Sequence, residues 1–139
     1  AGTTDDKQKG YIQVYLAQTQ LAQGNVQGVE SKLRNDVIKT AADDGLKAAA
    51  YNTLGDYYQQ ANQPDEALWQ YLRVDMLYKQ DREEQARALY NLAKLFESVR
   101  GDAARSKACL ERLKGDAFAG AEYQARALKE ETDGGAKAP

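Results

Sequence analysis

Residues 48–78 read AAAYNTLGDYYQQANQPDEALWQYLRVDMLY, and this stretch decides the fold. Tyr51, Leu54 and Tyr58 are spaced by three and four residues, so they share one face of a helix. Asn62-Gln63-Pro64-Asp65 predicts a turn, because proline fits the first turn of a helix but not its interior. The stretch therefore predicts two helices joined by a short turn.

Small and large residues in this stretch predict how the two helices pack. Gly55 removes a side chain where the second helix must come close, and Ala67 and Tyr71 give that helix matching small and large contacts. The order aromatic-x2-Leu-Gly-x2-Tyr, followed by Ala-x3-aromatic, resembles the tetratricopeptide repeat signature. The resemblance implies a helical hairpin that belongs to a repeat protein.

A second copy of the pattern follows 38 residues later. Leu89-x2-Leu92-Ala93-x2-Phe96 reproduces the first-helix spacing, and Arg100-Gly101-Asp102 predicts a turn one residue later than expected. After that turn come the residues in second-helix positions, which are Ser106, Leu110 and Leu113. The third repeat is therefore expected at about residues 82–115, after a central repeat at about 45–81.

A weaker copy precedes the central hairpin by the same 38 residues. Leu16-Ala17 falls on Leu54-Gly55, while Gly24, Val29 and Leu33 fall on a turn and a second helix. This first repeat, at about residues 7–44, has glutamines where the signature has aromatic residues. Three repeats at one period favour a shared architecture for the whole chain.

Residues 117–131 predict a single amphipathic helix carrying Phe118, Ala121, Ala125 and Leu128. Helical repeat proteins need such a helix to cover the apolar end of the last repeat. The predicted fold is thus all-α, a right-handed superhelix of three tetratricopeptide-like hairpins with a C-terminal capping helix. Residues 1–6 are expected to be a flexible N-terminus, and residues 132–139 a disordered tail.

Composition argues against several classes of function. The 139 residues carry a net charge of −2, which favours neither nucleic acid nor an anionic membrane surface, and no apolar run reaches membrane-spanning length. There is no histidine, which removes the commonest general base and metal ligand, and the single Cys109 therefore has no histidine partner. We expect no enzyme, no cofactor and no metal site.

The resemblance implies that the concave groove binds a partner protein or peptide through first-helix residues. The alternative is that these side chains are merely solvated. The positions that match the contact offsets of the family, and so form the predicted groove set, are Tyr11, Val14, Gln18, Asn52, Asp56, Gln59, Arg87, Tyr90, Lys94 and Glu97.

A second surface is predicted on the outer side of the central second helix. Trp69, Leu72 and Met76 share one face, opposite in phase to the predicted core residues. On the convex side they would form an apolar patch of the kind that marks interfaces. The alternatives are that a longer helix turns this face inward, or that a neighbouring helix covers it.

These patterns support a non-catalytic interaction or scaffold module as the leading hypothesis. One alternative is a structural element that forms a homo-oligomer through Trp69, Leu72 and Met76, and another is a regulatory domain of a larger protein. The repeat length also resembles that of bacterial cell-envelope tetratricopeptide domains. That resemblance favours the envelope or periplasm over the cytoplasm.

Overall fold

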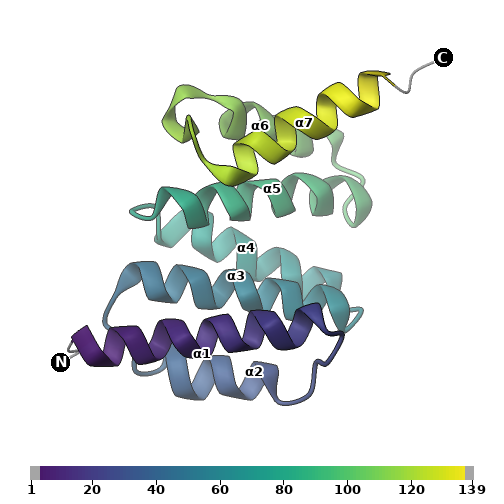
Figure 1. Cartoon of the computed structure of the whole chain (residues 1–139). Coiled ribbons are helices and arrows are strands. Elements are labelled where there is room, and N and C mark those ends of the chain that lie inside the picture. The colour runs from purple at the N-terminus through teal and green to yellow at the C-terminus, as the bar shows by residue number, and fades with distance from the viewer. Residues whose placement is uncertain (1–3, 137–139) are drawn as a thin grey trace.

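The computed structural model describes residues 4–136, and every regular element in that range is a helix (Figure 1). The expected all-α class is confirmed. The elements are α1 (Thr4–Ala22), α2 (Val29–Ser31), the π-helix η1 (Lys32–Ile38), α3 (Asp44–Gln60), α4 (Pro64–Leu77), α5 (Arg82–Ser98), α6 (Ala103–Lys114), the 3-10 helix η2 (Asp116–Phe118) and α7 (Glu122–Ala136).

The helices form two rows. In Figure 1, α1, α3, α5 and α7 lie in front, and α2, α4 and α6 lie behind them. Neighbouring front helices pack against each other. Behind them, α4 packs against both α3 and α5, α6 packs against α5, and η1 packs against α1. The hairpins are thus stacked so that α1, α3, α5 and α7 form one row.

Each hairpin turn contains at least one residue in the left-handed backbone region, and the first turn contains a second, Gly28, with φ 75°. Gly24 has φ 79°, Asn62 has φ 58° and Gly101 has φ 61°. Glycine adopts this region without a steric penalty, and asparagine tolerates it better than most other residues. A helix begins two residues after Asn62 and after Gly101, whereas the chain after Gly24 continues to Val29, so the first hairpin has a longer connection.

Aspartates are the N-cap residues of three helices. Asp43, Asp81 and Asp102 each accept a hydrogen bond from the backbone N–H three residues further on, at the starts of α3, α5 and α6. Such caps satisfy an N–H that has no partner inside its own helix. Asp43 and Asp81 are 38 residues apart, which equals the period of the repeats predicted from the sequence.

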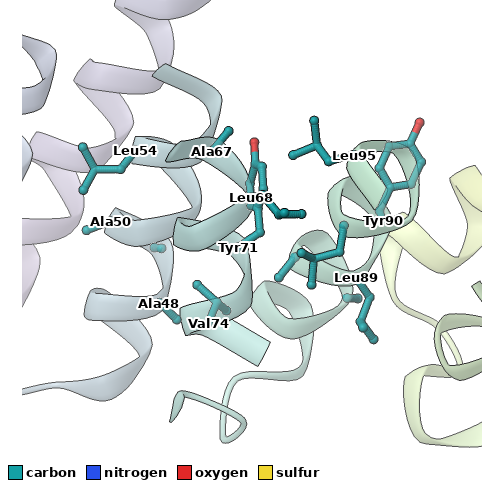
Figure 2. Close-up of a cluster of buried hydrophobic side chains, with 14 of the residues drawn as sticks. Ala48, Ala50, Leu54, Ala67, Leu68, Tyr71, Val74, Leu89, Tyr90 and Leu95 are labelled. Atoms are coloured by element: carbon teal, nitrogen blue, oxygen red, sulfur yellow. The ribbon is translucent and has the colours of Figure 1, made fainter. Parts of the chain in front are cut away.

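The centre of the core is a tyrosine between α3 and α5. Figure 2 shows Tyr71 of α4 among buried side chains of all three helices, including Leu54 and Leu89. A Cβ atom on Gly55 would lie 2.5 Å from the Tyr71 ring, which explains why position 55 lacks a side chain. The predicted close approach of the second helix at Gly55 is present.

Both predicted chain ends differ from the structure. Residues 4–6 belong to α1, whose first turn carries Asp5 and Asp6, and acidic residues stabilise a helix N-terminus. The disordered-tail prediction is wrong for residues 132–136, because α7 continues to Ala136. The predicted helix 117–131 in fact begins at Glu122, after η2. Residues 1–3 and 137–139 lie outside the described residues.

Candidate functional site

A hollow of about 380 Å³ opens on the front row, lined by side chains of α1, α3, α5 and α7. One predicted groove residue from each of α1, α3 and α5 lines it, namely Gln18, Asp56 and Arg87. We call this surface the acidic hollow, and its complete lining is Gln18, Asp56, Glu83, Glu84, Arg87, Glu122 and Tyr123.

Arg87 lies at the base of the acidic hollow and is only 7% exposed. Its Nη2 donates to Asp56 Oδ2 at 2.7 Å, and its Nη1 donates to Glu84 Oε1 at 3.2 Å. Burial alone lowers the pKa of the guanidinium, but the charges of Asp56 and Glu84 reverse this effect and raise it. Arg87 is therefore a fixed cation whose charge is already paired.

Hydrogen bonds from the core hold Asp56 and Glu84 in place. The buried Tyr71 hydroxyl donates to Asp56 Oδ1, and burial, followed by the Asp56 charge, raises the pKa of that hydroxyl. Asn52 Nδ2 donates to both the backbone oxygen and Oε1 of Glu84, each at 2.9 Å. These carboxylates are thus positioned before any ligand arrives.

Acidic side chains dominate the exposed rim. Glu83 and Glu122 are exposed, and Glu83 Oε2 accepts the backbone N–H of Glu122 at 3.4 Å. Arg126 donates to Glu122 Oε1 at 3.1 Å on the surface, where such pairs are weak. Because Arg87 is the only cation among the seven lining residues, the acidic hollow has a negative character.

One wall of the acidic hollow is aromatic. The Tyr123 ring of α7 lies 5.2 Å from the Tyr90 ring, and the Arg126 guanidinium lies 4.5 Å from the Tyr123 ring centroid. Lys94 Nζ donates to the Tyr90 hydroxyl at 2.7 Å, and that hydroxyl donates to Glu130. Tyr90 is only 6% exposed, its hydroxyl is already engaged, and this predicted groove residue does not line the acidic hollow.

Other predicted groove residues also lie away from the acidic hollow. Val14 and Asn52 are buried, so neither is available for direct contact with a ligand. Tyr11 is half-buried and donates to Asp43 Oδ2 at 3.4 Å, and burial together with the Asp43 charge raises its pKa to about 12. The remaining members of the predicted set, Gln59, Lys94 and Glu97, are exposed but do not line the hollow.

Sequence reasoning missed four lining residues. Glu83 and Glu84 lie in the first turn of α5, where acidic residues are typical of a helix start. Glu122 and Tyr123 begin α7, whose predicted role was only to cover the last repeat. The predicted capping role of this helix could have indicated them, because a helix that covers the end of the stack also borders the surface of the front row.

A second surface lies on the outer side of α4. Trp69, Met76 and Leu77 are 56%, 67% and 61% exposed, and Leu72 is half-buried. We call this surface the α4 face. Its hollow of about 450 Å³ is lined by Arg34, Glu66, Trp69, Gln70, Leu72, Arg73, Met76 and Leu77. Trp69 and Met76 are neither turned inward nor covered by another described helix.

The remaining chemistry of the described residues is limited. In residues 4–136, no group of three or more His, Cys, Asp or Glu side chains is arranged to hold a metal ion. Cys109 is buried, and burial raises the pKa of its thiol. No helix within this range has the length and apolar character needed to cross a membrane.

Comparisons with protein-family models, curated proteins and solved structures find no match to this chain. What the two surfaces bind must therefore be inferred from their own chemistry.

Proposed function

We propose that this chain is a non-catalytic protein-interaction module whose acidic hollow binds an extended segment of a partner protein. The observation that carries the proposal is the composition of that hollow, to which α1, α3, α5 and α7 each contribute side chains. A ligand that touches all four helices must run across the front row, as an extended peptide does.

We also propose that the hairpins form a tetratricopeptide-like superhelix. The left-handed turn residues and the recurring aspartate caps support this architecture, because both follow the repeats expected from the sequence. Stacked repeats create extended concave surfaces suited to peptides.

The lining favours a peptide with lysine or arginine side chains. Gln18 Nε2 already donates to Thr53 Oγ1 at 3.2 Å, which orients the amide so that its Oε1 can accept a peptide N–H. Glu83 and Glu122 offer carboxylates at the rim. Charge complementarity selects a partner and speeds its association. Because Asp56 and Glu84 are already held by the protein, binding requires little ordering of the site.

Selection of a random peptide library on the immobilised protein tests the proposal. We expect the selected peptides to be rich in lysine and arginine. The double variant Glu83→Gln/Glu122→Gln should bind them about tenfold more weakly, as expected for the loss of two rim charges. Fluorescence anisotropy with a labelled peptide measures the affinity.

Glu97→Gln is the matched control, because Glu97 is an exposed carboxylate of α5 outside the acidic hollow. Its affinity should equal that of the wild type. Selection of no peptide, or equal weakening by the double variant and the control, would overturn the proposal.

A further inference from the structure

The α4 face exposes large apolar side chains on a helix whose other side packs into the core. Trp69, Met76 and Leu77 are each more than half exposed, and Leu72 is half-buried beside them. Exposed apolar clusters of this kind mark interaction sites, and tryptophan is enriched among the residues that carry binding energy. The α4 face is therefore suited to an apolar surface on a partner.

The apolar residues of the α4 face follow the helix axis. Trp69, Leu72 and Met76 recur at three and four residues, so they form a stripe about 10 Å long on successive turns. Arg34 of η1 lines the same hollow, which is thus bordered by two helices. A partner helix with apolar side chains at the same spacing fits such a groove.

Arg73 gives the α4 face a charge that the described residues leave unpaired. This half-buried side chain lines the hollow and forms no ion pair within residues 4–136. Its Cζ lies 4.9 Å from the centroid of the Tyr51 ring, and this cation–π contact holds the guanidinium in place. The contact uses none of the N–H donors, and the fork of a guanidinium matches the two oxygens of a carboxylate.

The other charges in the lining also favour an acidic partner. Arg34 is half-buried, and its Nη2 donates to the Tyr58 hydroxyl at 2.9 Å; that hydroxyl donates to Glu30, which does not line the hollow. Glu66 is the only carboxylate among the lining residues, and it lies in the first turn of α4, where acidic residues stabilise a helix start. Two guanidinium groups thus face one carboxylate, and a second copy of the chain would bring like charges together.

We propose that the α4 face binds an amphipathic helix of a partner protein, in which aspartate or glutamate residues flank an apolar stripe. The stripe covers Trp69, Leu72 and Met76, and the flanking carboxylates pair with Arg34 and Arg73. The chain then has two interaction surfaces with opposite charge preferences. This inference does not depend on peptide binding in the acidic hollow, which lies on other helices.

Two synthetic helical peptides without tryptophan test the proposal. They share one leucine stripe, which is flanked by glutamates in the first peptide and by lysines in the second. Trp69 is the single tryptophan of the chain, so its emission reports binding at the α4 face. We expect the glutamate peptide to shift this emission to shorter wavelength in a saturable way, with an affinity about tenfold higher than that of the lysine peptide.

Charge reversal at Arg73 tests the role assigned to this cation. Arg73→Glu should weaken binding of the glutamate peptide about tenfold and strengthen binding of the lysine peptide, a gain that an unfolded variant would not show. Lys129→Glu is the matched control, because Lys129 is an exposed cation of α7 and no residue of α7 lines the α4 face. Both affinities of this control should equal those of the wild type.

Equal affinity of the wild type for the two peptides would overturn the proposal, as would no emission shift with either peptide. Equal weakening by Arg73→Glu and Lys129→Glu would also overturn it. A shift that appears with rising protein concentration and no peptide would identify a second copy as the occupant instead. Met76→Glu should lose the glutamate peptide and keep lysine-rich peptides in the acidic hollow, so the two proposals succeed or fail separately.

Discussion

Tyr71 connects the core to the acidic hollow through a single side chain. Its ring fills the space that Gly55 leaves open, and its hydroxyl donates to Asp56, which in turn holds Arg87. A change in the packing around the Tyr71 ring should therefore move the Asp56 and Arg87 side chains at the base of the acidic hollow. At the residue scale, stability and the proposed peptide binding therefore both involve this contact between α3 and α4.

Gly55→Ala should lower the free energy of unfolding by about 1–3 kcal/mol, because its Cβ would overlap the Tyr71 ring and the packed core must move. Urea denaturation measures the change. Gly134→Ala is the control, because a Cβ there meets nothing within 4 Å and alanine favours a helix. Equal stability of Gly55→Ala and wild type would contradict the packing described for Tyr71.

At the element scale, Asp75 of α4 connects three helices. Its Oδ1 accepts from Gln85 Nε2 of α5 at 2.9 Å, and Arg112 of α6 donates to both of its oxygens at 2.8 and 2.9 Å. The Asp75 side chain is largely buried, at 12% exposure. Burial alone would raise the pKa of this carboxyl, but the hydrogen bonds from Arg112 and Gln85 lower it below 3.8.

Because the pKa of Asp75 is lowered in the folded state, the contribution of this carboxylate to the free energy of unfolding depends on pH. Since the folded pKa is depressed, the stabilisation is complete above 3.8 and is lost as the pH falls through the folded value. Asp75→Asn should therefore cost about 1–3 kcal/mol at pH 7, and the difference from wild type should shrink at a low pH at which the wild-type carboxyl is protonated.

Urea midpoints at the two pH values measure this difference. Asp65→Asn provides the comparison, because Asp65 pairs with Arg100 on the surface and both side chains are exposed. Its effect should be small at either pH. A difference between Asp75→Asn and wild type that is the same at both pH values would contradict the role assigned to the carboxylate.

For the whole molecule, sequence alone predicted the features that local spacing encodes. The Gly55–Tyr71 approach follows from the order of small and large residues in one hairpin, and the turn residues Gly24, Asn62 and Gly101 interrupt the helical periodicity. These features depend on neighbours only a few residues away, or on the next helix in the chain.

The acidic hollow was only partly predictable, because it depends on how distant helices cross. Asp56 and Arg87 were identified, but Tyr90 is covered by α7, and α7 also adds Glu122 and Tyr123 to the lining. The angle at which α7 crosses α5 is set by packing over the whole helix. No local pattern records that angle.

Amide chemical-shift mapping of the labelled protein with a selected lysine-rich peptide tests the central claim most directly. The account predicts saturable shifts at Gln18, Asp56, Arg87 and Tyr123, with little change at Trp69 and Met76. Shifts confined to α4, or no saturable shift in residues lining the acidic hollow, would contradict it.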